Sequence, residues 1–322
     1  MQDFKEATEK VLKIDHTHAG IGRRTYENDR HWIDVNPKDI KIDKPTLLLL
    51  GGDMASGPEQ ANGMVKVFEG LGFNIPDILS VYYKNIEPGS TGFQRMNFFN
   101  SINMLKPSFK TIYAQQMAEN SNPQYVHEIF DAVIAPMISP DREQTAKNLG
   151  NLNIITYSHG SYVAAMLERA ALQKMSEMGY SDDEKNATIK HLTVVAVAPT
   201  IPVGYAKSDW TSMASLDDDF FVAQMSPDSI NRKLDDQEYG RVDAQVRKIS
   251  DNENLLIVNS LFQVDPLKNS NNQSEHNIKN FIARDVPNRI AGSFFNENLM
   301  KKLQERGITP LRNNNIRTEL TY

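Results

Sequence analysis

The sequence predicts an α/β fold, in which a mostly parallel sheet carries helices on both faces. Short runs of branched aliphatic residues alternate along the chain with segments whose apolar residues recur at helical spacing. The runs are almost continuously apolar, which is typical of strands that are covered on both faces of a sheet. With 322 residues, 40% of them apolar, the chain is long enough to bury a large core.

The predicted elements begin after residues 1–44, a polar segment that is poor in branched aliphatic residues and is expected to form a short helix and an extended arm. The first strand is 46–50, which ends in two glycines. The next helix, 61–71, has helical apolar spacing and stops at Gly72. The later elements are a strand at 78–83, one or two helices within 93–134, a helix from Pro140, a strand at 153–157, a helix at 161–178, strands at 191–197 and 255–258, and helices near 276–284 and 296–306.

These elements predict one α/β domain over residues 45–310. An acidic, irregular segment, about 199–252, is expected to be an insertion within it. Residues 311–322 are expected to form a loose C-terminal tail.

Composition excludes several classes of protein. A net charge of −6 and the lack of a dense basic cluster argue against nucleic-acid binding. Without cysteine the chain has no disulfide, no cysteine nucleophile and no thiolate metal site. No apolar run is long enough to span a bilayer, and the first residues lack the apolar core of a signal peptide. A soluble protein is expected, either cytoplasmic or exported without a cleaved signal.

Ser158 is the strongest candidate for a chemical role. An apolar strand runs into the segment Thr156-Tyr157-Ser158-His159-Gly160, and helix-favouring residues follow directly. Small residues two before and two after the serine allow a sharp turn, which holds its hydroxyl clear of the sheet. The helix N-terminus behind it can stabilise developing negative charge. This pattern predicts a nucleophile.

A serine nucleophile needs a base, and the expected chain order is serine, acid, histidine. Of the seven histidines, three lie at or after Ser158. His159 is adjacent to the serine, and its side chain is expected to point away from the serine hydroxyl. His191 begins a strand, at the edge opposite the one where strands present active-site residues. His276, in a polar loop, is therefore the predicted base.

The acid is expected just past the end of a later strand. Asp265 follows the strand 255–258 and precedes His276 by eleven positions, so one loop can present both groups. Asp265 is the predicted acid. Asp243 and Asp251 are weaker candidates, because neither ends a strand.

These motifs together resemble the α/β-hydrolase superfamily of serine hydrolases. Residues 47–53 look like its oxyanion strand and turn, 156–160 like its nucleophile elbow, and 264–267 like its acid loop, with His276 where its base falls. The resemblance covers roughly residues 45–285. It implies Ser158 as nucleophile, His276 as base, Asp265 as orienting acid, and the backbone N–H groups of His159 and of Asp53 or Met54 as the oxyanion hole.

The implied reaction is cleavage of a lipid or small carboxylic ester through an acyl-enzyme, without a metal or organic cofactor. The insertion lies where this family often carries a cap, so that Trp210, Phe220 and Phe221 face the substrate or belong to a surface loop. Thr156 in place of glycine, and a carboxylate at Asp53, favour the alternative of a catalytically silent binding protein with the same fold.

Two further motifs are weaker. The glycine-rich segment 51–57 suggests a nucleotide loop of an NAD(P)-dependent oxidoreductase, but Pro58 removes an N–H where phosphates need one. Asp15, His16 and His18, with His31, have metal-binding side chains but no partner cluster, so a polar arm is expected there.

Overall fold

The computed structural model describes residues 18–25, 27–52, 57–70, 72–73, 75, 77–83, 124–201, 203–215, 244–258 and 289–308. The strands in this part of the chain are β1 (Ala19–Thr25), β2 (Ile33–Asp34), β3 (Thr46–Leu50), β4 (Asp77–Tyr83), β5 (Leu152–Tyr157), β6 (Thr193–Val197), β7 (Asp209–Ser215), β8 (Ala244–Lys248) and β9 (Glu253–Val258). The α-helices are α2 (Asn62–Gly70), α4 (Gln124–Ile129), α5 (Arg142–Gly150), α6 (Gly160–Glu177), α7 (Asp182–Ile189) and α11 (Arg289–Glu305). Short helical turns are η1 (Pro37–Asp39), η2 (Pro58–Ala61), η3 (Phe130–Ile134) and η4 (Ala135–Met137).

The described strands form one nine-stranded sheet in the order β2-β1-β4-β3-β5-β6-β7-β9-β8. The six strands from β4 to β9 in this order run parallel, whereas β1 and β8 pair antiparallel with β4 and β9. The prediction of a mostly parallel sheet is confirmed. Because parallel strands end at the same side, their last residues share one edge, which we call the carboxyl edge.

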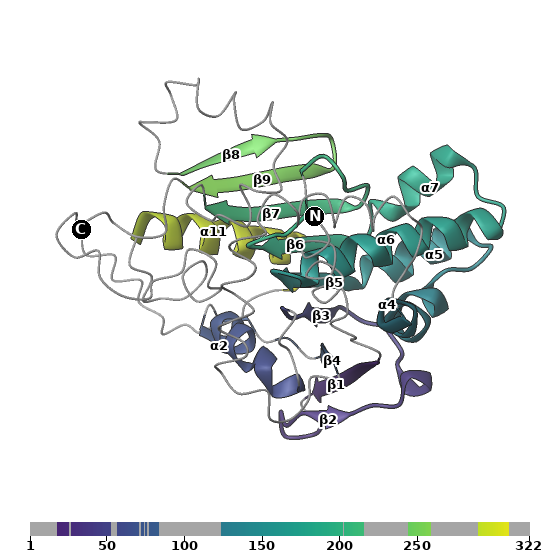
Figure 1. Ribbon diagram of the computed structural model, residues 1–322, viewed down its shortest axis with the longest axis horizontal. Helices are drawn as coiled ribbons and strands as arrows, with labels where there is room; N and C mark the ends of the chain where they lie inside the picture. The colour runs from purple at the N-terminus through teal and green to yellow at the C-terminus, as the bar shows by residue number, and fades with distance from the viewer. Residues whose placement is uncertain are drawn as a thin grey trace, which may run out of the picture.

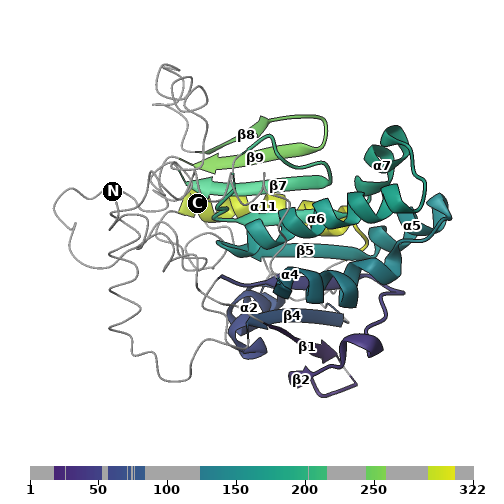
Figure 2. The ribbon, with the colours of Figure 1, turned by 45° about the vertical axis from the view of Figure 1, so that its right-hand side comes forward.

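Helices cover both faces of the sheet, as predicted (Figures 1 and 2). On one face, side chains such as Leu48 and Ile154 pack against α4, α5, α6 and α7. On the other face, side chains such as Leu49 and Ile155 pack against α2 and α11. Strands buried on both sides require apolar residues at consecutive positions, and Leu47 to Leu50 are all at most 1% exposed.

The predicted elements in the middle of the chain are confirmed closely. The strand predicted at 153–157 is β5, and the helix predicted at 161–178 is α6. The helix expected from Pro140 is α5, which Asp141 caps by accepting the N–H of Gln144 at 3.1 Å. These elements can be predicted from the sequence because apolar runs and helix caps depend on residues only a few positions apart.

The described part of the segment 1–44, for which a short helix and an extended arm are expected, carries two strands of the sheet. β1 and β2 lie within residues 18–44, and β1 pairs along its whole length with β4. Arg23 makes this polar strand compatible with the sheet, because its guanidinium donates two hydrogen bonds, of 2.8 and 2.6 Å, to the buried carboxylate of Asp77.

The irregular insertion predicted at 199–252 also contains sheet residues. β7 lies between β6 and β9, and β8 forms the edge of the sheet. Trp210 is fully buried in β7, where its Nε1–H donates to Ser212 Oγ at 3.0 Å, so the prediction that Trp210 faces the substrate or a surface loop is wrong. Residues 216–243, which include Phe220 and Phe221, lie outside the described residues, and so do 309–322.

Candidate active site

Ser158 stands at the carboxyl edge, between the end of β5 and the start of α6. Its φ is +52°, the left-handed conformation that side chains disfavour. Its N–H donates to the carbonyl oxygen of Val197 on β6 at 3.1 Å, so the corner continues the pairing of the two strands. The strand–serine–helix corner predicted from the sequence is therefore present.

Gly160 is required by the close approach of β3 to this corner. A Cβ at Gly160 would lie 2.2 Å from the carbonyl oxygen of Leu50 and 2.9 Å from that of Gly51, both of them backbone atoms. Any side chain here would push α6 away from the sheet. On the other side of the serine, Thr156 is tolerated, although it is fully buried and its hydroxyl finds no hydrogen-bond partner among the described residues.

The side chain of His159 lies among tyrosines. Its Nε2 is 3.2 Å from the hydroxyl of Tyr125, and its ring centroid is 5.4 Å from that of Tyr162 and 6.1 Å from that of Tyr83. Burial raises the pKa of Tyr162 to about 12, so this phenol stays protonated at neutral pH. These contacts direct the imidazole toward Tyr125, in agreement with the expectation that His159 points elsewhere.

The other predicted site residues lie outside the described residues: Asp53, Met54, Asp265 and His276. The segments that lead to them are described. A Cβ built at Gly52, next to Asp53, would be 3.8 Å from Ser158 Cβ, so the chain after β3 leaves the sheet beside the serine. β9, which precedes Asp265, runs parallel to β5 and ends at the same edge.

Two of the alternatives weighed in the sequence are placed at the opposite edge. His191 precedes β6, and its carbonyl oxygen accepts from Arg306 at 3.3 Å. Asp251 lies in the turn before β9, where its exposed carboxylate pairs with Lys248 at 2.8 Å. Since strands present active-site groups at their carboxyl ends, neither residue meets Ser158. Asp243, the third alternative, lies outside the described residues.

The possible metal ligands of the N-terminal segment are described only in part. His18 Nδ1 is 2.7 Å from Glu128 Oε1 of α4, an exposed pair that fixes the start of β1. Among the residues that the structure describes, no group of three acidic or histidine side chains is arranged to hold a metal ion. Asp15 and His16 fall outside that set.

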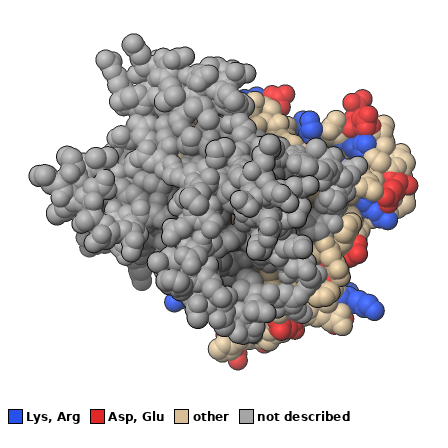
Figure 3. Space-filling view, in the orientation of Figure 1, with Lys and Arg blue, Asp and Glu red and all other residues tan. Residues whose placement is uncertain are grey.

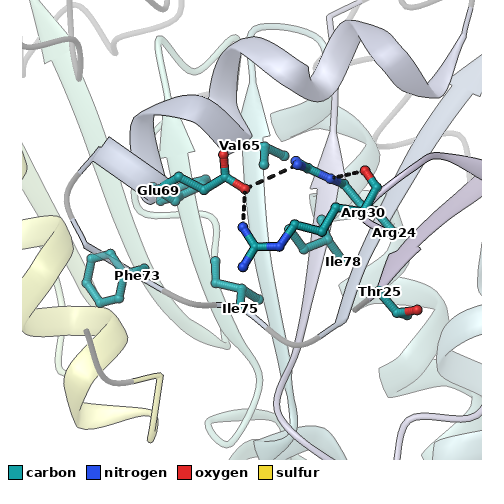
Figure 4. A pocket seen from close by; sticks show the side chains of 9 residues that line it. Arg24, Thr25, Arg30, Val65, Glu69, Phe73, Ile75 and Ile78 are labelled. Carbon is teal, nitrogen blue, oxygen red and sulfur yellow. Dashed lines mark hydrogen bonds and ion pairs between the residues drawn. The ribbon is translucent and has the colours of Figure 1, made fainter. Parts of the chain in front are cut away.

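A small pocket that is open to solvent lies between α2 and the first residues of β4 (Figure 4). Its rim carries Arg24 and Arg30, which both donate to Glu69 Oε1, at 3.2 and 3.1 Å. Phe68 and Ile78 form part of its apolar wall. β4 begins at the edge opposite Ser158, so this pocket is separate from the serine.

The described surface visible in Figure 3 carries acidic and basic side chains that are interspersed. In the described part of the chain, each helix is too short or too polar to traverse a lipid bilayer.

The sequence matches no protein-family model, and its comparison with curated proteins finds no relative. Among solved structures, a protein of Lactobacillus plantarum WCFS1 described as a "putative carboxylesterase" is 12% identical, with 90% of this chain and 99% of that chain covered and a TM-score of 0.33. A ferulic acid esterase is also 12% identical, with coverage of 76% and 91% and a TM-score of 0.27. The class of protein, an α/β protein with a serine at a strand–helix corner, is defined by the sheet and by Ser158 itself.

Proposed function

We propose that the protein is a serine hydrolase that cleaves a lipid or small carboxylic ester through an acyl-enzyme on Ser158. The observation that carries the proposal is the left-handed backbone of Ser158 between a central parallel strand and an 18-residue helix. A non-glycine residue in this conformation costs on the order of 1–3 kcal/mol, and such strain gathers at functional sites.

The proposed base and acid are His276 and Asp265. β6 and β7 separate β5 from β9, so the ends of β5 and β9 are about 14 Å apart at the usual strand spacing. Asp265 follows Val258 by seven residues, and an extended chain of that length spans up to about 23 Å. The segment after β9 is therefore long enough to bring Asp265, and His276 beyond it, back to the serine.

In the proposed reaction, His276 takes the proton of Ser158 as its hydroxyl oxygen attacks the ester carbonyl. Asp265 orients the imidazole. The backbone N–H of His159, at the N-terminus of α6, and that of Asp53 or Met54 stabilise the oxyanion, each contributing about 3 kcal/mol to barrier lowering. His276 then protonates the oxygen of the breaking ester bond, which leaves as the alcohol, and water activated by the same imidazole hydrolyses the acyl-enzyme to free the acid and Ser158.

The test uses a fluorophosphonate probe and p-nitrophenyl esters of short and long chain. We expect the wild type to be labelled on the peptide that contains Ser158, identified by mass spectrometry, and to hydrolyse at least one ester. Ser158→Ala should lose both properties and keep its circular dichroism spectrum, because the hydroxyl and not the fold is removed.

The alternative, a silent binding protein with this fold, is favoured by Thr156, whose buried hydroxyl next to the corner makes no hydrogen bond with any residue that the structure describes. A folded wild type that neither reacts with the probe nor hydrolyses any ester would support this alternative and reject the hydrolase. Nicotinamide fluorescence in the same preparation tests the oxidoreductase alternative, which requires measurable cofactor binding.

A further inference from the structure

The carbonyl oxygen of Ser158 accepts three hydrogen bonds from described residues. The N–H of Ser161 donates at 2.9 Å, the hydroxyl of Ser161 at 2.8 Å, and the hydroxyl of Thr200 at 3.3 Å. Ser161 and Thr200 are 0% and 5% exposed, so water competes little for these bonds. The start of a helix requires only one hydrogen bond to such a carbonyl. The two additional donors indicate that the orientation of the peptide unit between Ser158 and His159 is held for a reason other than helix formation.

The donors come from two corners that lie side by side. Ser161 is in the first turn of α6, and Thr200 follows the end of β6. The N–H of Thr200 donates to Ser161 Oγ at 2.9 Å, which joins the two segments directly. Ala198 directly follows β6, its φ of +47° is also left-handed, and its N–H donates to the carbonyl oxygen of Met213 on β7 at 2.9 Å. The strained turn at Ala198 thus brings Thr200 to the serine corner.

Fixing this carbonyl also fixes an N–H group. A peptide unit is planar, and the carbonyl of Ser158 and the N–H of His159 belong to the same unit and point in opposite directions. Without its hydrogen bonds, the strained unit after Ser158 could relax by rotating about the bonds on either side. Donors on the carbonyl also polarise the amide and strengthen its N–H as a donor.

We infer that Ser161 and Thr200 are positioning residues, which hold and polarise the His159 N–H so that it points at the oxyanion of the tetrahedral intermediate. The inference rests on the proposed function, in which this N–H is one of the oxyanion donors. It adds two residues that do not touch the substrate, and it gives a role to the left-handed turn at Ala198.

The experiment compares Thr200→Val, which removes the hydroxyl but keeps the shape, with Thr200→Ser, which keeps the hydroxyl, and adds Ser161→Ala. Losing an oxyanion donor costs about 10²–10³ in kcat, so misdirecting one is expected to lower kcat about 10- to 100-fold in Thr200→Val and Ser161→Ala. KM should change little, because the ground-state ester does not depend on this donor. The affinity for a trifluoromethyl ketone, which forms a tetrahedral oxyanion on the serine, should fall in parallel with kcat/KM. Thr200→Ser should behave as the wild type.

Equal losses of kcat in Thr200→Val and Thr200→Ser would overturn the inference, because the hydroxyl group would then not be what matters. A rise in KM at constant kcat would also overturn it, because the variants would then affect ground-state binding and not the transition state. Wild-type kinetics in a folded Thr200→Val would overturn it too. If Ser161→Ala does not fold, the comparison of Thr200→Val with Thr200→Ser is sufficient to test the inference. A labelled wild type with unaffected variants rejects only the positioning role, whereas an unlabelled wild type rejects the hydrolase and this inference together.

Discussion

Ser158 and Ala198 adopt the same disfavoured conformation at the ends of neighbouring strands. Each costs on the order of 1–3 kcal/mol, which the surrounding contacts must offset. Gly160 makes the first corner possible, because β3 leaves no room for a side chain. Conformational strain and close approach at single residues therefore fix where the serine hydroxyl stands.

Gly160→Ala should abolish labelling of Ser158 and destabilise the protein by about 1–3 kcal/mol, the usual range for overpacking. The reason is that the added Cβ would meet the backbone oxygen of Leu50 at 2.2 Å, and a strand cannot give way as a side chain does. Urea unfolding and probe labelling measure the two effects.

Gly63→Ala is the matched control. Gly63 lies in α2, and no atom of the described residues lies within 4 Å of an added Cβ, so alanine should raise stability by about 0.5–1 kcal/mol through helix propensity. Equal effects of the two alanines would show that contact with β3 is not what requires Gly160.

At the scale of elements, two buried carboxylates hold the segment 203–208 that leads into β7. Glu168 of α6 accepts the N–H groups of Lys207 and Ser208 at 2.8 and 2.9 Å, and Glu253 of β9 accepts the N–H of Gly204 at 3.0 Å. The irregular segment thus satisfies its donors with side chains from a helix and from a strand. Burial raises the pKa of both carboxyls, against the effect of these hydrogen bonds.

The raised pKa of Glu168 predicts a pH dependence. Between the unfolded pKa, about 4.3, and the higher folded pKa, the folded state keeps a proton that the unfolded state has lost, so stability falls as pH rises through this window. Relative to Glu168→Gln, which does not titrate, the wild type should therefore gain stability as pH falls, by about 1.4 kcal/mol for each unit of the pKa shift. Urea unfolding at a series of pH values measures the difference.

Glu184→Gln is the control with the opposite pH dependence of stability, because the pKa of Glu184 is lowered and not raised. Glu184 is exposed at the start of α7, where hydrogen bonds from the Ser181 N–H and from Arg142 lower the pKa of its carboxyl. Its stabilising effect is lost as pH falls through the lowered pKa, so the wild type should lose its advantage over Glu184→Gln in acid. If the stability difference between the wild type and each of the two variants, Glu168→Gln and Glu184→Gln, changed with pH in the same direction, the role of burial at Glu168 would be contradicted.

At the scale of the whole molecule, α11 closes the second face of the sheet from a distant part of the chain. Its residues Phe295, Leu299 and Leu303 are fully buried against the strands. At its C-terminal end, Lys302 and Arg306 both bind the carboxylate of Asp209, the first residue of β7. Apolar packing and a partly buried ion cluster thus join the last described helix to the middle of the sheet.

Asp209→Asn should destabilise the protein by about 1–3 kcal/mol, between the values for exposed and for buried pairs, because these side chains are 16–22% exposed and two cations would be left facing each other. Unfolding in urea at low and at high salt measures the change, and salt should reduce it. Asp251→Asn, which breaks the exposed pair with Lys248, should leave the unfolding midpoint unchanged. A midpoint shift of the same size in both variants would rule out a special role for the cluster.

The sequence by itself determined the parallel core and the serine corner. The run 46–50 has four leucines, the run 153–157 is centred on Ile154 and Ile155, and helix signals follow each of them, so local chemistry already specifies strand, turn and helix. Gly160 marks the corner in the sequence as the small residue two positions after the serine, whereas the approach of β3 that excludes a side chain there is a tertiary contact.

Only the tertiary structure decided which polar segments join the sheet. β1, with two arginines, and β7, with three hydroxyl side chains, lack the apolar runs of a buried strand, and they are strands because β4, β6 and β9 supply the hydrogen bonds and the burial. The link between Ser161 and Thr200 likewise joins residues 39 positions apart. Pairing between strands and contacts between distant corners depend on neighbours in space, and the composition of a segment does not encode them.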